Sequence, residues 1–196
     1  MSWDDWFTRR PDGRAAEFDA PAVRIEALPL DPVEGPAPRP PAITGKDRLA
    51  ALVGTGAAAL MLAIVAPWEG KRNDPYRDIV GVWTVCYGET RVAMRRYSDA
   101  ECDDMLADGL GDFARPVLTR NPELRGHAPQ LAAATSLAYN IGGQAYARST
   151  VSRRFSEGRW RQACDAFRSW NRAGGRVVQG LVRRREAERQ LCLREL

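Results

Sequence analysis

Residues 68–88 read WEGKRNDPYRDIVGVWTVCYG, and this stretch decides the fold. It begins at the end of a helix. Its second half, residues 78–88, is rich in β-branched and aromatic side chains and ends in Gly88, which predicts a small hairpin or sheet. A helix end followed directly by a hairpin brings the polar residues of both, Glu69, Asp78 and Thr84, to the rim of one cleft.

The residues after this stretch predict a series of helices. Ser98 and Glu101 have the spacing of a capping box, which opens a helix through about residue 113. Pro129 begins another helix, which runs to residue 140. Further helices are expected at residues 150–157, 160–173 and 179–193. The predicted fold class is therefore α+β, mainly α, with one small β element.

Glu69, Asp78 and Thr84 are the candidate catalytic residues. Cleavage of a glycosidic bond at neutral pH requires a carboxylic acid at the leaving oxygen and a second group that handles an attacking water. Glu69 lies between Trp68 and Gly70, where an apolar wall favours its protonated form. Asp78 is expected in a wetter setting that keeps it ionised, where the Thr84 hydroxyl helps to hold a water. Spacing alone is weak evidence, because Glu and Asp are usually surface residues.

The same stretch resembles the catalytic signature of the phage lysozymes of glycoside hydrolase family 24. The resemblance rests on Glu69-Gly70, Pro75-Tyr76-Arg77-Asp78, Gly81-Val82-Trp83-Thr84 and Gly88. Glu, Asp and Thr keep the spacing of that family's catalytic triad without a gap. The resemblance continues through residues 138–155, 163–164 and 180–192, and so covers essentially all of residues 68–196. This part of the chain is therefore identified as a lysozyme domain, most similar to the signal-anchor-release endolysins of lambdoid-type phages.

The resemblance implies a lysozyme-like fold with a small sheet lobe and a helical lobe. It implies hydrolysis of the β-1,4 bond between N-acetylmuramic acid and N-acetylglucosamine in peptidoglycan, which causes bacterial lysis. The implied reaction is inverting: Glu69 donates the proton while Asp78 and Thr84 position or activate the water. Tyr139 and Asn140 lie at a helix end that lines the substrate cleft in members of the family, so both residues are expected to contact sugars. The alternative for Tyr139 is a position in the core.

Three consecutive arginines occupy positions 183–185. One guanidinium, assigned to Arg184, is expected at the substrate site against Glu69 or Asp78, where it orients the carboxylate. At least two of the three arginines are expected on a solvated cationic face.

The chain has 18 consecutive uncharged residues from Leu49 to Ala66, preceded by Lys46 and Arg48. This length is the lower limit for a membrane-spanning helix. The basic residues predict a cytoplasmic N-terminus and a catalytic domain in the periplasm. Residues 46–67 are therefore expected to form a signal-anchor or transmembrane-like helix that contacts the inner membrane through residues 49–66. A buried helix of a soluble protein is the alternative, because ten of the 18 residues are Ala, Gly or Thr.

Residues 1–45 contain 8 of the 13 prolines and are expected to be a disordered cytoplasmic tail. Only Pro67 and Trp68 separate the apolar segment from Glu69. A form with this segment in the bilayer is therefore expected to be inactive until the segment leaves the lipid and packs against the lysozyme domain. The tail opposes such release, so a permanently tethered or virion-associated lysozyme is a variant of this hypothesis.

The four cysteines, Cys86, Cys102, Cys164 and Cys192, all follow the apolar segment. None belongs to a CxxC pair with metal-ligand spacing, so no metal site is expected. Two disulfides with three alternative connectivities, or four buried free thiols, both fit the sequence.

Residues 68–196 carry 22 Lys and Arg against 16 Asp and Glu, which favours a polyanionic partner such as peptidoglycan. The sequence has no pattern of a nucleic-acid-binding module, and we expect no nucleic acid among its partners. The chemistry requires no cofactor, and a monomer is expected. Two alternatives remain: a membrane-anchored or virion-associated peptidoglycan-binding protein with a lysozyme fold and little activity, and an enzyme of this fold that acts on chitin-like polymers.

Overall fold

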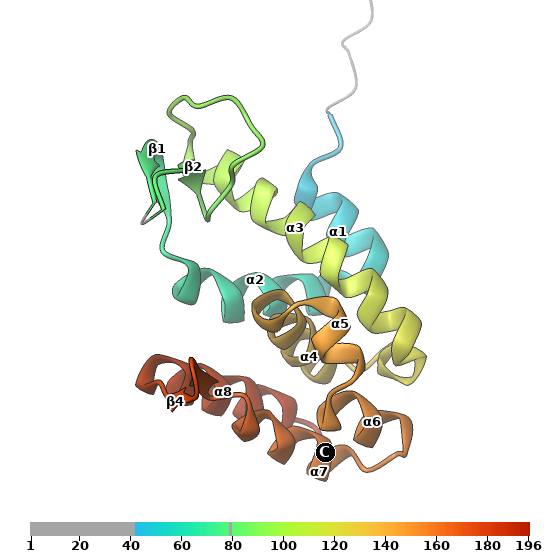
Figure 1. Cartoon of the computed structure of the whole chain (residues 1–196). Helices are drawn as coiled ribbons and strands as arrows, with labels where there is room; N and C mark the ends of the chain where they lie inside the picture. Colours follow the sequence, from blue (N-terminus) through green and yellow to red (C-terminus); the bar gives the residue numbers. More distant parts are fainter. Residues whose placement is uncertain (1–41, 79) are drawn as a thin grey trace, which may run out of the picture. The chain divides into compact units, whose positions relative to one another are not determined.

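The computed structural model describes residues 42–78 and 80–196, and Figure 1 shows how their helices and strands are arranged. The predicted Pro-rich tail, residues 1–45, lies outside the described residues apart from residues 42–45, of which Gly45 begins the first helix. The described part is mainly helical, as the sequence predicts, with two small two-stranded sheets, of which the sequence predicts the first.

The apolar segment forms two helices, α1 (Gly45–Val53) and α2 (Thr55–Glu69). Thr44 and Asp47 form a capping box at the start of α1. Gly54 separates the helices with a φ of 86°, and the pair is bent by 119°. Among the described residues, no single helix is long and apolar enough to cross a membrane, whereas this bent pair is, by length and composition. In this structure residues 46–67 are thus not the one continuous helix expected from the sequence.

The long helix α3 (Asp99–Arg120) begins at the predicted capping box. The Ser98 side chain accepts a hydrogen bond from the Glu101 amide, and the Glu101 carboxylate accepts one from the Ser98 amide. This prediction is confirmed, but the helix continues past residue 113 and through Pro116. Proline inside a helix costs about 3 kcal/mol. Burial of the neighbouring residues Val117 and Leu118 offsets that cost.

Helix α4 (Ala128–Ile141) forms the centre of the helical part. All residues from 129 to 138 are buried, and the helix packs against α2, α3 and α8 (Gln179–Cys192). A helix that is covered on every side in this way is a core helix. Its packing fixes the relative positions of the helices on which the site is built.

Four short helical elements lie between α4 and α8. They are α5 (Gly143–Ala147), α6 (Thr150–Ser156), α7 (Trp160–Ala166) and the 3₁₀ turn η3 (Phe167–Ser169). A further 3₁₀ turn, η2 (Pro122–Leu124), follows α3. The single helix expected at residues 160–173 is wrong, because the chain forms a hairpin of β3 (Arg172–Ala173) and β4 (Arg176–Val177). Gly174 and Gly175, with φ of 55° and 77°, make the two-residue turn between them.

The predicted small sheet is an antiparallel pair of β1 (Arg72–Arg77) and β2 (Trp83–Cys86). Strand β1 ends at Arg77, so it lies before the stretch predicted to contain the hairpin. Pro75 explains why the sequence pattern does not predict this strand, because proline is depleted in strands and occurs at edges and irregularities. The register is indeed irregular between Arg72 and Tyr76.

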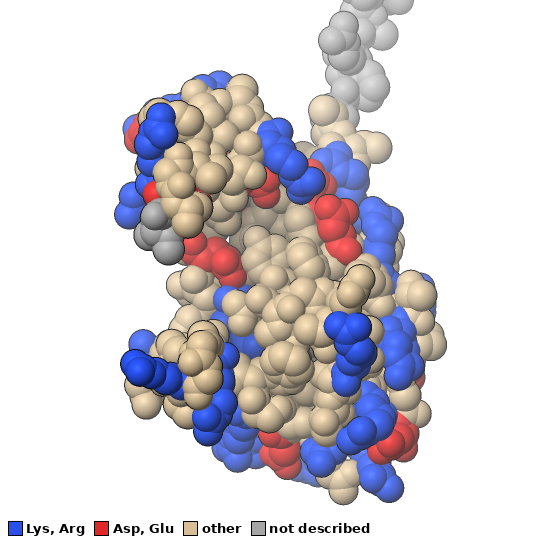
Figure 2. All heavy atoms as spheres, viewed as in Figure 1, with Lys and Arg blue, Asp and Glu red and all other residues tan. Residues whose placement is uncertain are grey.

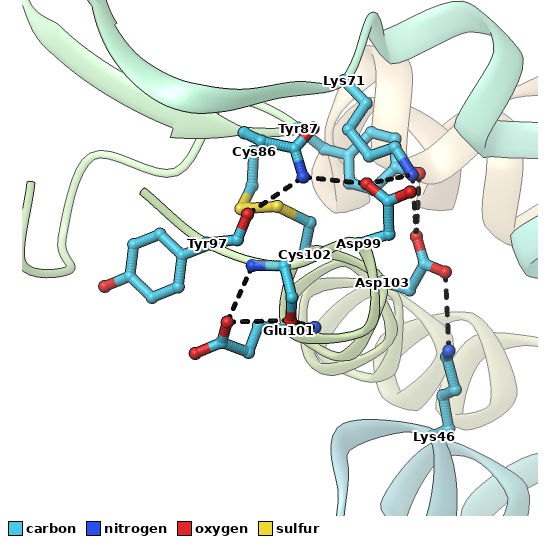
Figure 3. Close-up of polar contacts among 11 residues, drawn as sticks. Lys46, Lys71, Cys86, Tyr87, Tyr97, Asp99, Glu101, Cys102 and Asp103 are labelled. Atoms are coloured by element: carbon cyan, nitrogen blue, oxygen red, sulfur yellow. Dashed lines mark hydrogen bonds and ion pairs between the residues drawn. A yellow bond between two sulfur atoms is a disulfide. The ribbon is translucent and has the colours of Figure 1, made fainter. Parts of the chain in front are cut away.

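Polar contacts attach α1 and the sheet to α3, as Figure 3 shows. Lys46 lies 3.5 Å from the carboxylate of Asp103, which also accepts a hydrogen bond of 2.9 Å from the Tyr87 hydroxyl. Arg48 binds both oxygens of Asp108, at 2.9 and 2.6 Å. Exposed ion pairs contribute little each, typically about 0–1 kcal/mol. They therefore set the register of α1 on α3 more than the stability of the fold.

Two disulfides staple the fold. Cys86 of β2 is bonded to Cys102 of α3, and Cys164 of α7 to Cys192 of α8. Their sequence separations are 16 and 28 residues. Closing loops of this length stabilises a fold by about 3 kcal/mol in the chain-entropy description. The Cys86–Cys102 disulfide thereby fixes the β1–β2 sheet to α3, the helix that leads from the sheet into the helical part of the fold.

Gly45 allows α1 to approach α3 closely. A Cβ at this position would overlap the backbone oxygen of Asp104, so Gly45→Ala is expected to destabilise the fold by about 1–3 kcal/mol. Gly56 of α2 has no neighbour within 4 Å of its added Cβ. Gly56→Ala is therefore the matched control, expected to be neutral or to stabilise by up to about 1 kcal/mol. Thermal unfolding measures both, and equal stability of the two variants would contradict this packing.

Candidate active site

Glu69 is the last residue of α2. Gly70 ends the helix in the left-handed conformation, with φ of 67°, and the chain turns into β1 two residues later. The Glu69 side chain is 22% exposed, and its Oε1 accepts a hydrogen bond of 2.8 Å from Nη1 of Arg184. The expected contact between the arginine run and a candidate carboxylate thus occurs at Glu69.

Two of the three consecutive arginines are buried: Arg184 is 5% exposed and Arg185 0%. The expectation that at least two of them lie on a solvated face is therefore wrong. Glu188 balances part of their charge inside the protein, and its Oε1 lies 3.3 Å from Arg184 Nε and 2.9 Å from Arg185 Nη2. Buried charges persist only when paired in this way.

Asp78 closes the turn of the β1–β2 hairpin. Its Oδ1 accepts hydrogen bonds from the amides of Val80, at 3.0 Å, and Val82, at 2.8 Å. Its own amide donates to the Val82 carbonyl at 2.9 Å. These contacts hold Oδ1 within the turn. Asp78 therefore organises the loop in addition to any chemical role.

Thr84 lies in β2, the second strand of the hairpin, opposite Tyr76 of β1. It is only 4% exposed, and its hydroxyl donates a hydrogen bond of 3.1 Å to the Val82 carbonyl. Asp78 and Thr84 thus both bond to Val82, which couples their positions through one backbone unit.

Tyr139 and Asn140 lie at the C-terminal end of α4. Tyr139 is half-buried, with its ring edge-on to Phe113 at 5.2 Å between centroids. Burial, with a smaller contribution from the charge of Glu69, raises the pKa of Tyr139 to about 12, so its hydroxyl stays neutral. Asn140 is exposed. Tyr139 therefore combines core packing with a position near Glu69.

Figure 2 shows a hollow in the molecular surface between the part that carries β1 and β2 and the part that carries α8. Acidic side chains lie at its edge. The C-terminal end of α2, with Glu69, reaches this hollow from below the sheet (Figures 1 and 2). Among the residues that the structure describes, no group of three or more His, Cys, Asp or Glu side chains is arranged to hold a metal ion.

Sequence reasoning missed Glu188, Arg185 and Ser136. Ser136 of α4 donates a hydrogen bond of 2.7 Å to Glu188 Oε1. The spacing of Glu188, four residues after Arg184 and three after Arg185, is a signal for ion pairs on one helix face. Sequence cannot show that this face is buried, because α8 is rich in charged residues throughout.

The chain is similar to known proteins in sequence. Residues 66–188 match the family model described as phage lysozyme. The chain is 37% identical over 165 residues to a SAR-endolysin of Enterobacteria phage P21, an alignment that covers 79% of this chain and 97% of that protein. It is also 36% identical over 148 residues to a SAR-endolysin of Pseudomonas phage phiKMV, covering 72% and 91% of the two chains.

Solved structures share the fold. The muramidase domain of SpmX from Asticaccaulis excentricus is 28% identical, with a TM-score of 0.59 over 68% of this chain and 94% of that one. The active form of the P1 phage endolysin Lyz is 25% identical, with a TM-score of 0.59 over 78% and 96% of the chains. The mainly helical fold with a small sheet is thus the lysozyme-like fold predicted from the sequence.

Proposed function

Because this chain belongs to the phage lysozyme family and is a peptidoglycan-hydrolysing enzyme of the endolysin type, we propose that Glu69, Asp78 and Thr84 carry its chemistry. The bond cleaved is the β-1,4 linkage between N-acetylmuramic acid and N-acetylglucosamine. The observation that supports this assignment most strongly is the placement of Glu69, a partly exposed carboxyl held by a buried guanidinium at the hollow.

Glu69 is the general acid. It protonates the glycosidic oxygen as the bond to the anomeric carbon breaks, which requires the carboxyl group to be protonated when the substrate binds. Arg184 orients the carboxyl through the 2.8 Å contact to Oε1, which directs the other oxygen towards the substrate. We propose that the glycan also contacts Arg184 beside Glu69, and that its flanking sugars meet Tyr139 and Asn140.

Asp78 and Thr84 handle the water. Asp78 Oδ1 is occupied by two amide donors, which leaves Oδ2 to accept a proton from water as the water attacks the opposite face of the sugar. The Thr84 hydroxyl, held against Val82 O, positions the same water. The reaction inverts the anomeric centre.

Replacement of Glu69 tests this mechanism. Glu69→Gln keeps the shape of the side chain but cannot donate the proton, so clearance of purified peptidoglycan is expected to fall by at least about 100-fold. Glu157→Gln, at an exposed carboxylate that pairs with Arg153 and Arg159, is the control and should clear the suspension like the unmodified chain. Full activity of Glu69→Gln with unchanged thermal unfolding would refute the assignment.

The described structure also suggests how activity is controlled. We propose that residues 49–66 first anchor the chain in the inner membrane, with the catalytic domain in the periplasm, and that the described fold is the form reached after they leave the lipid. The same residues cannot lie in a bilayer and pack against α3 and α4 as they do here. Because α2 ends at Glu69, the anchored form lacks an assembled site.

The outer face of α2 allows this proposal to be tested without disturbing its packed face. Gly56, Ala59 and Ala63 are exposed, whereas Met61 and Val65 are fully buried. Replacing the three exposed residues with Leu strengthens membrane insertion by on the order of 0.5 kcal/mol each. The expected result is retention in the membrane fraction and loss of lysis after expression in bacteria.

The control carries Gly56→Ala alone, which has room for the added Cβ and changes the apolar character of the segment little, so the chain should stay lytic. Lysis by the Leu variant at the rate of the unmodified chain would exclude release from the membrane as the controlling step.

A further inference from the structure

A buried cluster of charged residues lies behind Glu69. It consists of Arg184, Arg185 and Glu188 on α8, which are 5%, 0% and 0% exposed, and the buried Ser136 of α4. The mechanism proposed above uses only Arg184 from this cluster. Burying three charges is costly unless they serve each other or the site.

One oxygen of Glu188 collects three donors. Its Oε1 accepts hydrogen bonds from Ser136 Oγ at 2.7 Å, Arg185 Nη2 at 2.9 Å and Arg184 Nε at 3.3 Å. Arg184 uses a different nitrogen, Nη1, for its 2.8 Å contact to Glu69. The Arg184 guanidinium is therefore shared between two carboxyl groups, Glu69 at the surface of the site and Glu188 in the interior.

This sharing addresses a conflict in the site. A general acid has to be protonated, but a guanidinium at hydrogen-bond distance favours the ionised carboxylate. Two buried arginines without a counter-charge would strengthen that effect, because charges interact strongly in the protein interior. A second carboxylate on the far side of Arg184 offsets the positive charge without breaking the contact that orients Glu69.

We propose that Glu188 is a positioning residue for the lysozyme reaction. It holds Arg184 in place for Glu69 and offsets part of the positive charge of the two arginines behind the acid. This inference rests on the proposed role of Glu69 as the acid.

Glu188 has to be ionised to act in this way. Burial raises the pKa of Glu188, and the charges of Arg185 and Arg184 and the Ser136 hydroxyl oppose that rise. Burial likewise lowers the pKa of Arg185, but a guanidinium keeps its proton in proteins. Three donors converge on one Glu188 oxygen, which favours the carboxylate.

Tyr139 and Glu89 are two further titratable groups near this part of the site. Tyr139 of α4 is neutral, because burial raises its pKa to about 12. Glu89, which follows β2, also lies within electrostatic range of Tyr139. Neither contacts Arg184 by a hydrogen bond or ion pair of the described residues, so Glu188 is the carboxylate that shares this guanidinium with Glu69.

The test is the pH profile of peptidoglycan hydrolysis by the full chain. The activity of an enzyme with a general acid falls as pH rises and the acid loses its proton. Glu188→Gln leaves the charge of Arg184 and Arg185 unbalanced, so the alkaline limb is expected to move to lower pH by about 0.5–1 unit. Glu188→Asp, which retains the charge, should restore the original limb.

Glu186→Gln is the matched control. Glu186 lies two residues away on the same helix, with its side chain 39% exposed, and pairs with Arg168 and Arg189 on the surface. Its replacement removes the same charge and should leave the limb unmoved. If the limb of Glu188→Gln coincides with that of Glu186→Gln while overall activity falls, Glu188 is only structural and the inference is overturned.

A second variant covers the case in which Glu188→Gln does not fold. Arg184→Gln removes the positive charge next to Glu69, so its alkaline limb is expected at higher pH, and an unmoved limb overturns the inference. Failure of the underlying function has a different signature. If Glu69→Gln still hydrolyses peptidoglycan, the acid is misassigned, whereas an unmoved limb in a chain that depends on Glu69 refutes only the role of Glu188.

Discussion

The packing of α2 against α4 and α8 determines whether this protein has an active site. Glu69 is the last residue of α2, so its position follows from the burial of Ala57, Ala58, Met61 and Val65 along that helix. Full burial of a side chain such as Met or Val stabilises the fold by about 1.5–3 kcal/mol. The helix that supplies the proposed acid is also the most apolar helix described, and the same residues therefore serve the fold in water and suit a bilayer.

Helix α8 and the β1–β2 hairpin supply the other residues of the proposed site. Helix α8 supplies the guanidinium that holds Glu69, and α8 is itself fixed by α4 and by the Cys164–Cys192 disulfide. The hairpin supplies Asp78 and Thr84 on a turn organised by Val82, and the Cys86–Cys102 disulfide fastens it to α3. Two separately stapled parts thus face each other across the hollow, with the end of α2 between them.

The residues of the site could be read from the sequence better than their surroundings. The spacing of Glu69, Asp78 and Thr84, with its resemblance to a known signature, predicted the candidate site, and capping chemistry predicted the start of α3 correctly. The bend at Gly54, the strand that contains Pro75 and the β3–β4 hairpin were missed, because each depends on tertiary packing that outweighs local propensity. The burial of Arg184 and Arg185 was missed for a related reason. A charged pattern shows which residues can pair and not whether water reaches them.

The most direct test of this account compares peptidoglycan hydrolysis by residues 42–196 with hydrolysis by residues 68–196. The shorter chain keeps Glu69, Asp78 and Thr84 but lacks the helix that holds Glu69 in place. The account predicts that residues 42–196 clear the suspension and that residues 68–196 are at least about 100-fold slower, since loss of positioning alone costs about that much. Equal rates for the two chains would contradict it.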